Sequence, residues 1–82
     1  MDSMDQIYRK HSRMIYAFLL SRTGEASLAE ELTQETFYQA VKSLDSFKGQ
    51  SSAYTWLCGI ANNVWLAYLR KQKRAGEIFS SD

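Results

Sequence analysis

The chain has 82 residues, of which 45% are hydrophobic and 23% charged, with a formal net charge of +1. A chain of this size buries about 60% of its unfolded surface, which allows one modest core and excludes a second domain. The absence of proline argues against all-β folds and favours uninterrupted helices. A single cysteine and a single histidine exclude an internal disulfide and a clustered zinc site.

The net charge conceals an uneven distribution along the chain. Residues 1–24 carry four basic and two acidic side chains, residues 25–46 carry five acidic and one basic, and residues 47–82 carry five basic and two acidic. Nucleic-acid binding depends on a local basic patch and not on the average charge. The composition is therefore compatible with a nucleic-acid partner.

No segment predicts export or membrane insertion. No apolar run approaches the ~20 residues that a membrane-spanning helix needs, and the first residues are acidic, unlike those of a signal peptide. Together with the lone cysteine, these features predict a cytoplasmic protein.

The first predicted element is a helix over residues 4–22. Ser3 and Gln6 have the spacing of a capping box, and Gly24 stands where helices commonly end in a left-handed residue. The side chains expected on one face, at spacings of three and four, are Ile7, His11, Met14, Ile15, Phe18 and Leu19.

The second predicted helix covers residues 28–44. Ser27 and Glu30 have capping spacing at its start, and acidic side chains fill its N-terminal half, where the helix dipole favours negative charge. Its expected apolar side consists of Leu32, Phe37, Ala40, Val41 and Leu44.

A polar connector, residues 45–52, precedes the third and longest predicted helix, residues 53–74, for which Ser51 or Ser52 is the expected cap. Its expected apolar stripe is Trp56, Leu57, Ile60, Ala61, Val64, Ala67 and Tyr68. The sequence thus predicts an all-α fold, a small three-helix bundle with a long third helix. Residues 1–75 form the expected domain, and residues 76–82 are expected to be a tail or the start of an interdomain linker.

The sequence offers little for catalysis or for binding a metal. His11 is expected to be packed or half-exposed, and Cys58 is expected to be a structural thiol without a neighbouring base. The acidic residues of the second helix lack the spacing of an EF-hand or a Glu-x-x-His pair. We therefore predict no enzyme activity, cofactor or metal, and a small hydrolase is the least supported alternative.

The third helix combines aromatic, amide and basic side chains, which suits single-stranded nucleic acid because bases stack on aromatic rings and cations hold the backbone. Trp56 and Tyr68 also lie on the apolar stripe, so simple core packing is an open alternative for both. The basic residues have an alternative explanation as well, since cations near a helix C-terminus favour the dipole.

Residues 30–74 resemble region 2 of the extracytoplasmic-function group of the sigma-70 family, the promoter-recognition subunits of bacterial RNA polymerase. The resemblance rests on the segments Leu32–Phe37, Leu44–Phe47, Lys48–Ser52 and Thr55–Leu57, together with Ile60, Ala61 and Asn63, in one register without a gap. Residues 4–22 are similar to the opening helix of that region, less distinctively.

The resemblance implies two binding surfaces. Glu31, Gln34 and Glu35 would dock on the clamp helices of the polymerase β′ subunit. The minus-ten promoter element would bind on and before the third helix, with a flipped non-template base in a pocket formed by Phe47, Lys48, Gly49, Gln50, Ser51, Ser52, Ala53 and Asn63. Stacking or backbone contacts would come from Tyr54, Trp56, Asn62, Arg70, Lys71, Lys73 and Arg74.

The chain departs from the family pattern in three ways. It has almost no room for a short preceding helix, Gly59 stands where a polar residue is usual, and no helix-turn-helix domain follows. We therefore expect an excised domain. The alternative function is a helical protein-interaction module, which binds an anti-sigma factor or another partner without intrinsic DNA affinity.

Overall fold

The computed structural model describes residues 3–47 and 51–79, with side chains described as far as residue 76. Its elements are α1 (Met4–Thr23), α2 (Ala26–Ser43), the short 3₁₀ helix η1 (Leu44–Ser46) and α3 (Ala53–Phe79). The predicted all-α fold with a long third helix is confirmed. None of the described helices is long and apolar enough to cross a membrane.

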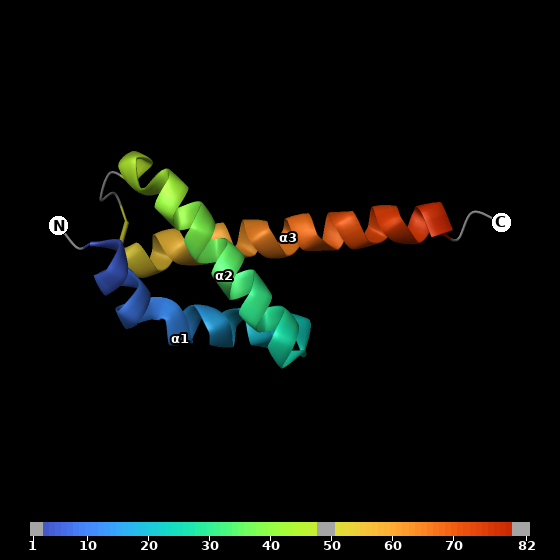
Figure 1. Ribbon diagram of the computed structural model, residues 1–82, viewed down its shortest axis with the longest axis horizontal. Helices are drawn as coiled ribbons and strands as arrows, with labels where there is room; N and C mark the ends of the chain where they lie inside the picture. Colours follow the sequence, from blue (N-terminus) through green and yellow to red (C-terminus); the bar gives the residue numbers. More distant parts are fainter. Residues whose placement is uncertain (1–2, 48–50, 80–82) are drawn as a thin grey trace.

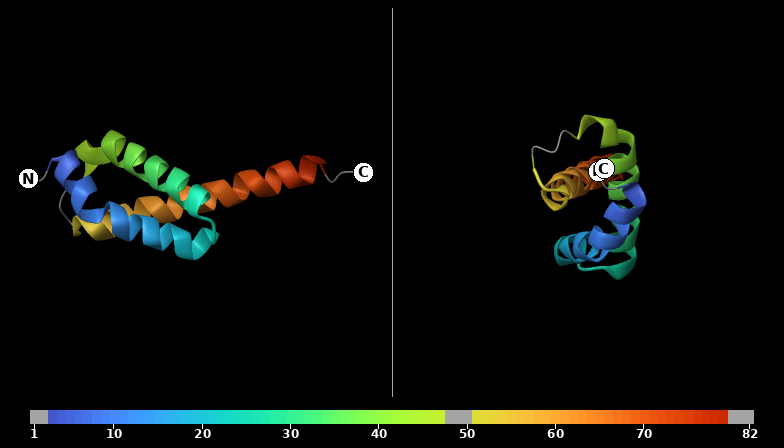
Figure 2. Two further views of the ribbon diagram at one scale, coloured as in Figure 1. Left: turned by 60° about the horizontal axis from the view of Figure 1, so that its bottom comes forward. Right: turned by 90° about the vertical axis from the view of Figure 1, so that its left-hand side faces the viewer.

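The three α-helices each pack against the other two. Figure 1 shows α1 and α2 running in opposite directions, with α2 crossing α3 obliquely. The C-terminal half of α3 projects beyond both partners, which gives the molecule extents of 54 × 25 × 17 Å. The end-on view of Figure 2 places the three helices around one shared interior. Much of the surface of α3 is therefore left free by its partners.

The core draws apolar side chains from all three helices. It consists of Ile7, Ile15, Leu19, Ala29, Leu32, Phe37, Ala40, Leu57, Ala61 and Val64. Three residues of the expected apolar faces are instead exposed, Met14 by 54%, Val41 by 55%, and Ala67. Met14 precedes and Val41 follows a buried residue in sequence, so each points about 100° away from that residue around its helix, outside the arc that the neighbouring helices cover.

Two buried threonines on α2 satisfy their hydroxyl groups within the helix. Thr33 Oγ1 donates to the Ala29 carbonyl at 2.6 Å and Thr36 Oγ1 donates to the Leu32 carbonyl at 2.8 Å. These bonds avoid the cost of burying an unpaired hydroxyl, which is about 1–3 kcal/mol. The small threonines thus let α2 lie close to its neighbours.

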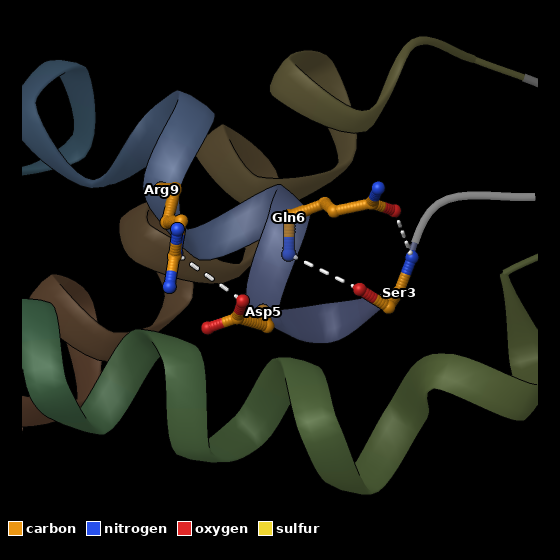
Figure 3. Close-up of polar contacts among 4 residues, drawn as sticks. All are labelled: Ser3, Asp5, Gln6 and Arg9. Carbon is orange, nitrogen blue, oxygen red and sulfur yellow. Dashed lines mark hydrogen bonds and ion pairs between the residues drawn. The ribbon is translucent and has the colours of Figure 1, made fainter.

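Both predicted end signals of α1 are confirmed. In the capping box, the Ser3 backbone N–H donates to Gln6 Oε1 at 2.9 Å and the Gln6 N–H donates to Ser3 Oγ at 3.2 Å (Figure 3). Gly24 has a φ of 72°, and its N–H donates to the Leu20 carbonyl at 2.9 Å. The ion pair between Asp5 and Arg9 in the same view is largely exposed to solvent, and such pairs contribute only about 0–1 kcal/mol.

The predicted start of α2, at residue 28, is wrong by two residues. The helix begins at Ala26 with Glu25 as its N-cap, so Ser27 lies inside the helix and does not cap it. The left-handed turn at Gly24 reverses the chain at once, and the Glu25 N–H donates to Thr23 Oγ1 at 3.2 Å. The new helix therefore starts before Ser27 is reached.

The C-terminal end of α3 also differs from the prediction, because the helix continues past Arg74 to Phe79. No proline interrupts it, and Gly76 within a helix costs only about 1 kcal/mol. Consequently the four basic residues 70–74 do not lie in the last turn of α3. The helix dipole acts mainly within the last turn, so it does not account for them.

Candidate functional site

The outward side of α2 carries the three residues expected to dock on a protein. Glu31, Gln34 and Glu35 are all exposed. Tyr38 and Val41 continue the same stripe at spacings of three and four and are exposed by 59% and 55%. We call these five residues the docking face.

Tyr38 and Val41 were not expected at this surface, although the sequence contains a signal for them. Residues 31, 34, 38 and 41 recur at helical spacing on the side opposite the buried Leu32, Thr36 and Ala40. The Lys42 ammonium lies 5.1 Å from the centre of the Tyr38 ring. Exposed aromatic rings such as that of Tyr38 are enriched at protein interfaces.

The connector is joined to the start of α3 by an aromatic stack. The rings of Phe47 and Trp56 have centroids 4.6 Å apart and planes inclined by 21°. Both side chains are half-buried, so the stack lies at the surface of the bundle. Phe47 is further held by its N–H, which donates to the Leu44 carbonyl at 3.1 Å.

Ser52 caps α3, which decides between the two predicted caps. Its Oγ accepts from the Thr55 N–H at 3.1 Å and donates to Thr55 Oγ1 at 3.0 Å. Of the residues expected to form a base pocket, Phe47, Ser51, Ser52 and Ala53 therefore gather at the start of α3. Lys48, Gly49 and Gln50 lie outside the described residues.

Tyr54 does not share the side of α3 on which Phe47 and Trp56 stack. Its ring lies 6.0 Å from the ring of His11 on α1. A hydrogen bond with the Cys58 thiol, the negative charge of the corresponding thiolate and partial burial raise the pKa of Tyr54 above its usual 10.0. Tyr54 and His11 are both half-buried, so their ring contact helps to join α3 to α1.

A groove with a volume of about 600 Å³ runs between α2 and α3. Its apolar floor includes Ile60 and Val64, and its polar residues are Glu35, Gln39, Ser43, Asn63, Arg70 and Lys71. Gln39 Nε2 donates to Glu35 Oε2 at 2.7 Å across one turn of α2. The groove thus brings Glu35 of the docking face together with three residues expected to contact DNA.

The two neighbouring asparagines of α3 have different surroundings. Both are exposed, but Asn63 lines the groove and Asn62 does not. Asn63 lies roughly 10 Å along the helix axis from Trp56, at a rise of about 1.5 Å per residue. Neither Phe47 nor Ser51, Ser52 or Ala53 lines the groove that contains Asn63.

The four basic residues lie on the projecting half of α3 (Figure 1). All four are exposed, but only Arg70 and Lys71 line the groove, whereas Lys73 and Arg74 lie elsewhere on the helix. Gly59 is also exposed, and a Cβ added there would meet nothing within 4 Å. Packing therefore does not require glycine at this position.

A smaller groove, about 280 Å³, runs between α1 and α2. Gln34 of the docking face lines it, together with Tyr8, Arg13, Tyr16 and Glu30. Tyr8 meets Phe37 edge-on, with ring centroids 4.9 Å apart. The docking face is therefore a ridge with a groove on each side.

Comparisons with known proteins agree on one family. Residues 7–75 match the family described as Sigma-70 region 2. The chain is 39% identical to the ECF RNA polymerase sigma factor SigM of Bacillus subtilis, over 98% of this chain and 47% of that protein. It is 37% identical to the RNA polymerase sigma factor YlaC of the same organism, over 85% of this chain and 40% of that protein.

A third relative is the ECF RNA polymerase sigma-E factor of Salmonella typhimurium, which is 43% identical over 71% of this chain and 30% of that protein. The chain therefore spans less than half the length of these relatives. No solved structure gives a significant match.

Proposed function

Because the chain belongs to the sigma-70 family, as a region 2 domain of the extracytoplasmic-function group, we propose that it is the promoter-recognition module of a bacterial RNA polymerase sigma factor. In this proposal it binds and melts the minus-ten element and docks on the β′ clamp helices. The observation that carries the proposal is the layout of α3. This one helix presents the stack with Phe47 at its start, Asn63 in its middle and four exposed basic residues before its last turn.

Each part of α3 suits a different contact with DNA. The serine hydroxyls and exposed backbone near Ser52 can hydrogen-bond the edge of a base, and extruding a base from a duplex costs only a few kcal/mol. The basic residues can hold phosphates, which positions the strand without reading its sequence. Asn63 supplies an amide that can pair with a base edge.

The docking face supports the second half of the proposal. It lies on α2, whereas the groups proposed to contact DNA lie mainly on α3 and the connector, so DNA and polymerase can be bound together. Its acidic side chains complement a partner rich in arginine, and Tyr38 supplies an aromatic group of the kind that dominates binding energy at interfaces.

A second candidate function is binding to an anti-sigma factor without intrinsic DNA affinity. Leu66 and Leu69 favour it, because each is 41% exposed on α3 and neither is among the residues proposed to contact DNA. Co-purification with such a partner, combined with no measurable DNA affinity, would favour this function for the isolated chain.

The proposed function is tested by fluorescence titration of the chain with single-stranded oligonucleotides at low and high salt. A strand carrying a minus-ten element should bind more tightly than a scrambled strand, and both affinities should fall with salt. Equal affinity for the two strands would overturn base reading. Affinity that does not change with salt would overturn the assignment of the basic residues to the backbone.

A further inference from the structure

We propose that α3 pairs in antiparallel orientation with α3 of a second copy of this chain, through a stripe of exposed residues on its outer side. The members of this outer stripe recur at alternating spacings of three and four. They are Gly59, Asn62, Leu66, Leu69, Lys73 and Gly76. None of the six lines the groove between α2 and α3 or belongs to the docking face. The self-association goes beyond the proposed function and does not depend on it.

The outer stripe lies on the side of α3 that faces away from the core. Leu66 follows the buried Leu57 by nine residues, which at about 100° per residue places the two on opposite sides of the helix. Leu66 and Leu69 are each 41% exposed. In the end-on view of Figure 2, α1 and α2 lie toward one side of α3 and leave its other side open. The described part of the bundle therefore does not cover these two leucines.

The ends of the outer stripe are glycines that the fold of a single copy does not require. A Cβ added to Gly59 or to Gly76 would meet nothing within 4 Å. Among the described glycines, only Gly24 has a positive φ, so backbone conformation does not require the other two either. Glycine inside a helix is unfavourable relative to alanine, but it lets another backbone approach closely. A second helix lying along the outer stripe gives both glycines a purpose.

The order of the residues makes the outer stripe complementary to itself. From either end the stripe runs through a glycine, a polar residue and a leucine to its centre. If two copies of α3 run antiparallel, Leu66 of one meets Leu69 of the other at the centre. Asn62 then meets Lys73 of the second copy, and the glycines at the ends meet each other. A two-fold interface needs such reciprocal contacts, and spacings of three and four let two helices pair along a continuous line.

The polar residues favour the antiparallel orientation over the parallel one. In the antiparallel pair, the side-chain oxygen of Asn62 can accept a hydrogen bond from the Lys73 ammonium of the second copy. In a parallel pair, the two Lys73 ammonium groups would face each other and repel. The antiparallel pair separates them by roughly 16 Å along the axis, at about 1.5 Å per residue. Single polar residues in a helix pair commonly determine its register in this way.

The length of the outer stripe indicates a reversible dimer. It spans residues 59–76, roughly 27 Å of helix at about 1.5 Å per residue. A contact along one helix face is at the small end of protein interfaces, below about 1,200 Å², where association is weak. Asn62 and Lys73 are also among the residues proposed to contact DNA. The dimer is therefore a state of the chain without DNA.

The first test is sedimentation equilibrium of the full chain without nucleic acid, at concentrations from micromolar to millimolar. We expect the average mass to rise with concentration from the 9.5 kDa of one chain toward twice that value. Leu66→Glu should weaken the dimer about tenfold or more, because it buries a carboxylate of each copy at the centre. Ala67→Glu is the matched control, since it adds the same charge at an exposed position that lines the groove. It should leave association unchanged, and circular dichroism checks that both variants are folded.

Disulfide cross-linking in a glutathione redox buffer tests the register, with Cys58→Ala present in every chain. An equimolar mixture of Asn62→Cys and Lys73→Cys chains should form a mixed covalent dimer, because these two positions face each other in the antiparallel pair. Lys73→Cys alone is the control and should not cross-link, since its two copies lie far apart along the axis. Mass spectrometry distinguishes the mixed dimer from dimers of either variant.

Four results would overturn the dimer. They are a single-chain mass at every concentration, equal effects of Leu66→Glu and Ala67→Glu, self-cross-linking of Lys73→Cys as efficient as its cross-linking to Asn62→Cys, and association that disappears at high salt. A single-chain mass would leave the outer stripe to a different protein. Loss of association at high salt would indicate contact between acidic α2 and basic α3 instead. None of these results bears on the proposed function, because DNA and polymerase are absent from every measurement.

Discussion

Phe47 at the end of η1 stacks on Trp56 in α3, with ring centroids 4.6 Å apart. The stack joins two residues that lie nine positions apart in the sequence. The two residues are thereby fixed relative to each other. This geometry makes Trp56 a structural partner of Phe47 as well as a candidate surface for a base.

The stack should couple the two residues energetically. A double-mutant cycle with Phe47→Ala and Trp56→Ala should give a coupling of about 0.5–1.5 kcal/mol in the free energy of unfolding, as aromatic pairs do. Urea denaturation followed by circular dichroism measures it. Strict additivity of the two substitutions would show that the stack contributes nothing, and Trp56→Phe should retain most of the stability.

The cap on α3 gives a matched pair of neighbouring serines. Ser52→Ala removes the hydrogen bond to the Thr55 N–H and should lower the free energy of unfolding by about 1 kcal/mol. Ser51→Ala removes no cap and should change it by less than about 0.5 kcal/mol. Thermal unfolding of both variants makes the comparison, and equal losses would contradict the assignment of the cap.

The docking face should be sensitive to loss of its exposed aromatic ring. Tyr38→Ala should weaken binding to RNA polymerase core enzyme about tenfold, because buried aromatic anchors at interfaces typically contribute more than 1 kcal/mol. Met14→Ala removes a similarly exposed apolar side chain from α1 and should have no effect. Competition binding with a labelled sigma factor measures both, and equal affinities would argue against this surface.

The acidic side chains of the docking face should act mainly through charge. Glu31→Gln should slow association with the polymerase and make it less dependent on salt, since rim charges affect the association rate. Glu25→Gln is the control, because Glu25 caps α2 and lies outside the docking face. Stopped-flow association at low salt distinguishes the two, and identical rates would contradict the proposal.

Tyr54 should titrate above the usual tyrosine pKa of 10.0. Because hydrogen bonding to Cys58 and the charge of the thiolate raise its pKa above 10.0, Cys58→Ala should lower the pKa of Tyr54. The unfolded chain loses this proton at lower pH than the folded chain. The resulting stability is therefore present below pH 10 and is lost as the pH rises through the raised pKa.

This prediction is measured by the ultraviolet absorbance of tyrosinate during a pH titration. The difference between the chain and Tyr54→Phe isolates Tyr54 from the other tyrosines. An unchanged titration of Tyr54 in the Cys58→Ala variant would show that the thiol is not the cause of the shift.

The sequence by itself determined the helices and most of the core. The capping box at Ser3, the left-handed turn at Gly24 and the spacing of the buried residues from Ile7 to Val64 are local properties, since each depends on residues only a few positions apart. Local signals failed at two helix ends, at Ser27 and beyond Arg74, because the turn geometry at Gly24 and the continuity of α3 decided the boundaries.

Only the tertiary structure decided which polar residues share a surface. The crossing of α2 and α3 places Asn63 with Gln39 and leaves Asn62 outside, although the two asparagines are adjacent in sequence. Likewise Tyr54 lies against α1 whereas Trp56 meets Phe47. Helical periodicity gives the direction of a side chain relative to its own axis, but its neighbours depend on how the helices cross, which distant residues determine through packing.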